Sequence, residues 1–218
     1  MIPKSIISQQ KLLQKISIVS NLNKPLKDGL YFSRYFIDFF DQSYLDETLE
    51  NWEDISDKSY FLNQLDIIVN ENLEGIEEVI KLNLNSRKHL VEEIFKLYKL
   101  RFYSAMITLS LSQVDGIMKE ITKRNGFYNS RNEKLKYLDD DLYVGFFSEF
   151  ELLNVEKRND YELFKKDITN MSLLNRHAIL HGESVEFGHN INALKVILLL
   201  TFIAELYPNN QSLTENNK

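Results

Sequence analysis

Cysteine is absent from this chain of 218 residues. Disulfide bonds, thiolate metal ligands and a cysteine nucleophile are therefore excluded, and the composition suits a reducing compartment. Residues 1–17 also lack the apolar core and the small-residue cleavage site of a secretory signal. We therefore expect a cytoplasmic protein.

Proline and glycine are both scarce. The only prolines are Pro3, Pro25 and Pro208, so residues 26–207 contain none, and there are seven glycines in all. Because proline ends or kinks helices, helices in this chain can be long. Apolar residues recur at intervals of three and four, as in a helix with one buried face. We predict an all-α chain with helices over 4–19, 29–41, 59–82, 86–124, 140–155, 160–168, 172–181 and 190–207.

No hydrophobic run is long enough to suggest a membrane span. The most apolar stretch covers residues 196–204, between Lys195 and Glu205, whereas a membrane-spanning helix needs about 18 apolar residues or more. We predict a buried core helix here and no membrane partner.

The charge is unevenly distributed. The chain as a whole carries a formal charge of −6, but residues 81–136 contain 12 lysines and arginines against 5 acidic residues. A net acidic protein is poorly suited to wrapping duplex DNA, because such binding depends on neutralising phosphates. The basic segment could hold one short RNA strand, or its side chains could simply solvate the outer faces of long helices, which is the simpler interpretation.

A polar cluster interrupts the apolar carboxyl-terminal part of the chain in the sequence "LLNRHAILHGES", residues 173–184. Gly182 stands where a left-handed helix cap belongs, so we predict that the helix ends at His181. The carboxyl end of a helix favours a cation, and histidine changes charge near neutral pH. His177 and His181 share a face, whereas Arg176 lies about 140° from His181 around the helix. A second copy across a twofold axis would bring these groups together.

The sequence "NRHAILHG", preceded by "RFYSAMITLSLSQVDGI" and followed by "FGHNINALKVILLL", resembles the HEPN superfamily (higher eukaryotes and prokaryotes nucleotide-binding domain), in particular bacterial members from phage-defence and toxin–antitoxin systems. Their motif is an arginine, a polar residue, and a histidine after four to six intervening positions. The resemblance implies an antiparallel helical bundle over 86–207, which leaves 1–85 as an N-terminal helical extension and 208–218 as a polar tail.

The resemblance also implies a metal-independent endoribonuclease, without a cofactor, whose composite site forms in a homodimer. Arg176 would stabilise the charge on the phosphate and His181 would transfer protons. Asn175 and His177 would contact or orient the RNA, and Asp115 could orient a histidine from behind or be an ordinary surface carboxylate. We expect the dimer to form through helices 172–181 and 190–207, with Arg176 and His181 facing a shared groove.

Two alternatives use the same residues differently. The spacing of His177 and His181 would suit zinc, but Ala178 replaces the glutamate of a metalloprotease helix, and only Glu183 or His189 could complete the ligand set. The motif helix could also serve only as a dimer surface, in a non-catalytic interaction module. With either function, an antitoxin or another regulatory protein could be a partner.

Overall fold

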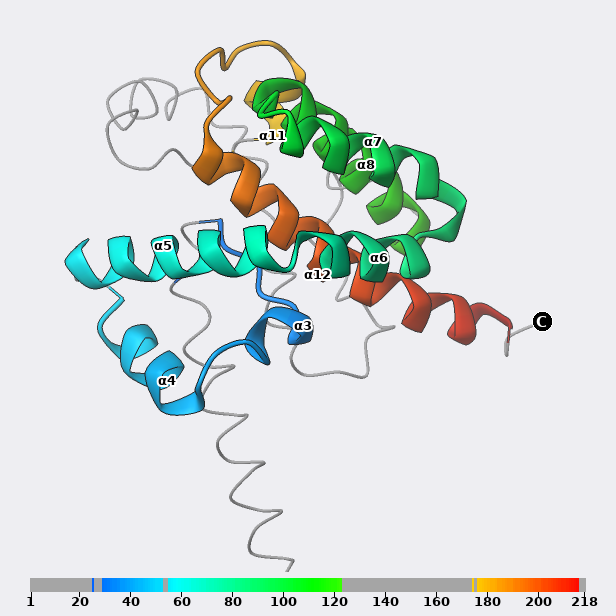
Figure 1. Ribbon diagram of the computed structural model, residues 1–218. Helices are drawn as coiled ribbons and strands as arrows, with labels where there is room; N and C mark the ends of the chain where they lie inside the picture. Colours follow the sequence, from blue (N-terminus) through cyan, green and yellow to red (C-terminus); the bar gives the residue numbers. More distant parts are fainter. Residues whose placement is uncertain (1–24, 26–28, 53–54, 123–173, 175, 216–218) are drawn as a thin grey trace, which may run out of the picture.

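Every regular element that the structure describes is a helix (Figure 1). The computed structural model describes residue 25, residues 29–52 and 55–122, residue 174, and residues 176–215. The all-α prediction is confirmed for these residues, while the predicted helices over 4–19, 140–155 and 160–168 lie outside them. The helices are α3 (Arg34–Ile37), α4 (Gln42–Glu50), α5 (Ile55–Glu71), α6 (Leu73–Asn83), the 3-10 helix η1 (Asn85–Arg87), α7 (Lys88–Lys99), α8 (Tyr103–Thr122), α11 (Arg176–Leu180) and α12 (Asn190–Glu215).

The long helix α12 runs through the centre of the described structure (Figure 1). It packs most extensively against α8 and α6, and also meets α3 and α5. All nine residues of 196–204 are buried, so the predicted core helix is confirmed. The segment Asn190–Tyr207 has the length and apolarity to cross a membrane, but 78% of it is buried inside the protein, as in a core helix. The helix also continues beyond the predicted end at 207, to Glu215.

Helices α7 and α8 replace the single helix predicted over 86–124, and this prediction was wrong. The chain turns at residues 100–102, where Arg101 has a φ of 60°. The amide of Phe102 donates to the carbonyl of Leu97 at 3.0 Å, and that of Arg101 to the carbonyl of Tyr98 at 2.9 Å. This is the Schellman pattern, which usually has glycine at the left-handed position. The turn lets α7 pack against both α6 and α8.

Helices α5 and α6 likewise replace the single helix predicted over 59–82. They are separated at Asn72, whose φ of −111° and ψ of 15° leave the helical region. Backbone hydrogen bonds still connect Asn72 to Ile68 and Ile76 to Asn72, and the Asn72 side chain donates to the Ile68 carbonyl at 2.9 Å. The interruption is therefore a local kink with its backbone hydrogen bonds largely kept.

Residues before and after the predicted domain boundary at 85/86 contribute to one hydrophobic core. The boundary falls within η1. Leu65, Ile76 and Ile80 on the amino-terminal side belong to the same buried cluster as Ile94 of α7 and the apolar residues of α12. Tyr31, Phe32 and Phe36 are buried in it as well, although only Arg34–Ile37 of the helix predicted over 29–41 is helical. This shared core holds α8 and α12 in place around the motif.

Candidate functional site

The motif helix α11 is shorter than the helix predicted over 172–181, because Leu174 lies outside it, but it ends at the predicted cap. Gly182 has a φ of 74°. Its amide donates to the carbonyl of Ile179 at 3.2 Å, and the amide of Glu183 donates to the carbonyl of Ala178 at 2.8 Å. These bonds form a second Schellman cap, this time with glycine at the left-handed position. The predicted cap at Gly182 is confirmed.

Replacing Gly182 with alanine should destabilise the protein through its backbone alone. A Cβ at this position would meet nothing within 4 Å, so the cost is that of a left-handed alanine, about 1 kcal/mol. We expect a thermal midpoint about 2–4 °C lower. Glu183→Ala is the matched control, since Glu183 is exposed and does not have a positive φ. Equal midpoints for the two variants would contradict the prediction.

The structure brings Arg176 of α11 against Asp115 of α8. Arg176 Nη2 lies 2.7 Å from Asp115 Oδ1, and the two side chains are 5% and 18% exposed. The apolar residues on and just before this helix are buried as well, namely Leu174, Ala178 and Ile179. Because a buried guanidinium needs a compensating negative charge, Asp115 fixes the position of α11 on α8. The sequence placed both residues in one site and suggested that Asp115 could orient a histidine. In the structure, Asp115 contacts Arg176 directly.

Asp115 also contacts a second cation. Lys119 lies one turn further along α8, with its Nζ 3.3 Å from Asp115 Oδ2 and its side chain 51% exposed. The carboxylate is thus shared between a buried arginine and an exposed lysine. The three side chains together carry one net positive charge.

His181 differs from Arg176 in its exposure to solvent. It lies in the turn after α11 and is exposed, so solvent reaches the imidazole but scarcely reaches the guanidinium. The sequence predicted that both groups face one groove, and this difference in exposure was not predicted. His177 lies within α11, but its side chain is outside the described structure, and so is the whole of Asn175.

The loop after α11 returns along α8 to the start of α12. Arg176 lies beside Asp115, whereas a Cβ on Gly188 would collide with the side chain of Ser104, at the other end of α8. The segment between these two points, which includes His181, therefore runs towards the amino end of α8. Asn190 Nδ2 then donates to Asp66 Oδ1 at 3.0 Å, which joins the loop end to α5.

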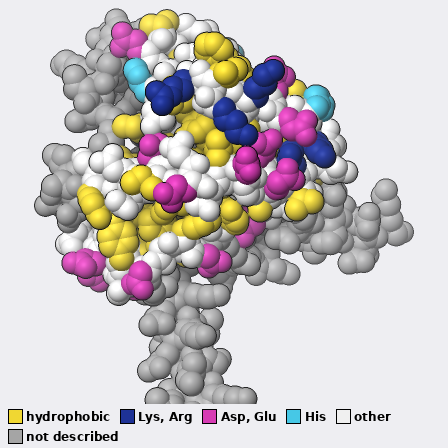
Figure 2. Space-filling view, in the orientation of Figure 1, with side chains coloured by type: hydrophobic (Ala, Val, Ile, Leu, Met, Phe, Trp, Pro, Cys, Tyr) yellow, Lys and Arg dark blue, Asp and Glu magenta, His cyan; other side chains and the backbone are white. Residues whose placement is uncertain are grey.

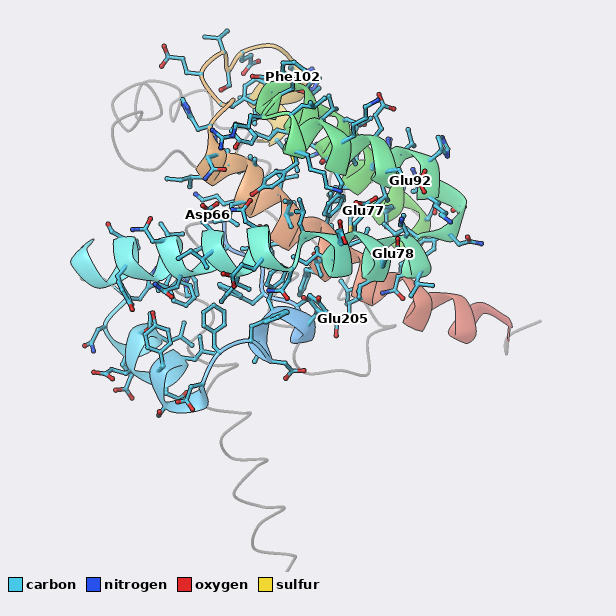
Figure 3. All side chains as sticks on the ribbon, viewed as in Figure 1. Asp66, Glu77, Glu78, Glu92, Phe102 and Glu205 are labelled. Atoms are coloured by element: carbon cyan, nitrogen blue, oxygen red, sulfur yellow. The ribbon has the colours of Figure 1, made fainter. Side chains whose placement is uncertain are left out.

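Most of the described basic residues of the segment 81–136 are paired with carboxylates. Lys81 forms ion pairs with Glu77 and Glu92 at 3.5 and 3.7 Å and with Glu78; the carboxylates of these three residues are labelled in Figure 3. The hydrogen bond from Lys81 lowers the pKa of Glu78, and the same bond raises the pKa of Lys81. These charges therefore pair with one another, and the side chains of Lys81 and Glu77 are only 11% and 14% exposed.

Arg87 and Lys99 are paired in the same way. Arg87 forms an ion pair with Glu120 and donates to Gln113 Oε1 at 2.7 Å. Lys99 Nζ lies 3.3 Å from Glu77. Four of the seven described basic residues of this segment are therefore paired with carboxylates.

Two features of the site region were not predicted from the sequence. Lys119 was grouped with the solvated lysines, although its spacing of four from Asp115 is the signal for an ion pair along a helix. Lys195 stood out only as the end of an apolar run, yet it is 1% exposed. A Cβ on Gly29 would lie 3.6 Å from its Cδ. Nothing in the sequence indicates that residue 29 covers this lysine.

Comparison of the chain with protein-family models, curated proteins and solved structures finds no significant match. Among the residues that the structure describes, no three His, Asp or Glu side chains are grouped as a metal ion would require. The features of this protein that bear on its function are therefore the motif and the geometry of α8 and α11.

Proposed function

We propose that this protein is a metal-independent endoribonuclease of the HEPN type, which acts as a homodimer in the cytoplasm in phage defence or a toxin–antitoxin system. The observation that supports the proposal best is the contact between Arg176 and Asp115. It fastens the motif helix to α8 and leaves His181 exposed at that helix's capped end. The charge of Arg176, the helix cap at Gly182 and the exposed imidazole of His181 thus lie within one short segment.

Cleavage would proceed through the RNA's own 2′-hydroxyl. A base removes the 2′-hydroxyl proton, the 2′-oxygen bonds to phosphorus, and the bond from phosphorus to the 5′-oxygen breaks as that oxygen receives a proton. His181 suits proton transfer because it is exposed and an imidazole can both accept and donate a proton. Arg176 would stabilise the additional negative charge on phosphate. This role requires its guanidinium to turn from Asp115 towards the phosphate when RNA binds.

Asn175 and His177 would contact or orient the strand, as the resemblance implies. Asp115 acts through Arg176 in this proposal, as a positioning residue. No cofactor takes part, since the charge and the proton transfers come from side chains. An antitoxin or another regulatory protein would restrain the activity.

A test of this proposal is the treatment of total RNA with the purified protein in excess EDTA. We expect cleavage to continue and the fragments to carry 2′,3′-cyclic phosphate and 5′-hydroxyl ends, because acid–base chemistry needs no metal. The ends can be identified by whether polynucleotide kinase labels the 5′ side without prior dephosphorylation. A rate that vanishes with EDTA and returns with zinc or manganese would favour the metal alternative instead.

The burial of Arg176 favours a second candidate, a non-catalytic module in which the motif helix only supports dimerisation. A guanidinium that is 5% exposed and paired with a carboxylate can have a purely structural role. This candidate predicts no RNA cleavage by the wild type, and dimerisation that survives His181→Ala.

A further inference from the structure

The turn between α7 and α8 exposes two cations and two large apolar side chains. Leu100 and Phe102 are 54% and 60% exposed, and Lys96 and Arg101 are exposed as well. We refer to these four residues as the turn surface. Figure 2 shows lysine and arginine side chains gathered in this upper part of the molecule beside exposed hydrophobic atoms, and Figure 3 labels Phe102 there.

The turn surface lies in a stretch without acidic residues. Residues 94–114 contain no aspartate or glutamate, and the nearest carboxylates along the chain, Glu92 and Glu93, lie one turn before Lys96 on α7. Lys81, Arg87, Lys99 and Lys119 have carboxylate partners, whereas no described carboxylate pairs with Lys96 or Arg101. These two cations are therefore available to an external anion.

The left-handed backbone of Arg101 lowers the stability of the fold, and its side chain makes no ion pair with a described residue that would offset this cost. A left-handed non-glycine residue costs about 1–2 kcal/mol, and φ is 60° here. At the equivalent position of the cap after α11 the residue is Gly182. Among the described residues, no side chain pairs with the Arg101 guanidinium, so no described ion pair offsets this cost.

The turn surface lies at the end of α8 towards which the His181 segment runs. Phe102 is two residues from Ser104, and Ser104 is in contact distance of Gly188, in the loop that begins at His181. The neighbouring loop carries exposed Glu183 and Glu186, whereas the turn surface carries Lys96 and Arg101. A strand bound at this end of α8 would therefore be held by the turn surface.

We propose that the turn surface is a docking site for single-stranded RNA, which rests on the proposed function for the choice of RNA as the partner. Unpaired bases stack on exposed aromatic rings and arginine planes, and cations hold the phosphates. Phe102 and Arg101 supply the stacking groups, and Lys96 and Arg101 supply the charge. A duplex would hide its base faces from Phe102, so the site prefers single strands.

The test measures binding of a short fluorescent 2′-O-methyl oligouridylate to the full chain, by anisotropy over a range of salt concentrations. This probe has no free 2′-hydroxyl and cannot be cleaved by the proposed mechanism. Phe102→Ala should weaken binding at least about fivefold. Arg101→Gly should weaken it about threefold and lower the salt slope by about 0.7, as expected for one lost phosphate contact.

Arg101→Gly distinguishes a loss of RNA binding at the turn surface from a loss of binding caused by misfolding. Glycine adopts the left-handed backbone without strain, which stabilises the folded state, but it also increases the entropy of the unfolded chain. The thermal midpoint of this variant should therefore be no lower than that of the wild type, and at most about 2 °C higher. Leu82→Ala and Lys88→Gln are the matched controls, because both side chains are exposed and lie away from the turn. Neither control should change affinity.

Weaker binding by both turn variants, with the affinity of the controls unchanged, would support the docking site. If the wild type binds in this way but cleaves no RNA, only the proposed function fails. Equal binding by the wild type and the turn variants would overturn the docking site and leave the proposed function standing. A wild type that does not bind the probe at all would also overturn the docking site, and would direct attention to a protein partner at this turn.

Discussion

Asp115→Ala should lower the free energy of unfolding by about 2–3 kcal/mol, because it leaves the guanidinium of Arg176 buried without its carboxylate. The arginine side chain is only 5% exposed, so solvent compensates little for the lost carboxylate. The 18% exposure of Asp115 keeps the expected loss below the range for fully buried pairs. Urea denaturation of the two proteins would measure the difference.

Lys119→Ala is the control for this experiment. It removes the other cation that contacts Asp115, but that lysine is 51% exposed, so the loss should stay below about 1 kcal/mol. A double-mutant cycle of Asp115→Asn with Arg176→Gln would then isolate the coupling between the pair. If Asp115→Ala were no more destabilising than Lys119→Ala, the pair would not be what holds α11 against α8.

His181→Ala should reduce RNA cleavage by about a hundredfold or more, the usual contribution of a positioned acid or base. Since His181 is exposed in a turn, the thermal midpoint of the His181→Ala protein should remain close to that of the wild type. His89→Ala, which removes an exposed histidine at the start of α7, should leave cleavage unchanged. Cleavage by the His181→Ala protein at the wild-type rate would refute the mechanism.

The same variant tests whether the site is shared between two copies. His181→Ala and Arg176→Gln proteins, mixed under conditions that allow subunit exchange, would form dimers with one intact arginine and one intact histidine. We expect such mixtures to recover part of the activity that each variant lacks alone. The melting curve of Arg176→Gln must be recorded beside it, because loss of the Asp115 pair lowers stability as well as charge. A chain that cleaves RNA as a monomer would contradict the shared site.

Local chemistry was enough to predict several features from the sequence. The long proline-free stretch and the three-and-four spacing led to an all-α fold, and residues 196–204 are buried as their composition implies. Gly182 marks the end of α11 because glycine adopts a left-handed backbone without strain. In each case the controlling interactions lie within a few residues along the chain.

Features that depend on distant parts of the chain were decided only by the tertiary structure. The turn at Arg101 has neither glycine nor proline to announce it, and it forms because α7 packs back against α6 and α8. The contact of Arg176 with Asp115 follows from the packing of α11 on α8. The burial of Lys195 beside Gly29 follows from the meeting of the amino-terminal segment with α12. A side chain's burial and its ion-pair partner are set by which surfaces meet in three dimensions, and local spacing carries little information about such meetings.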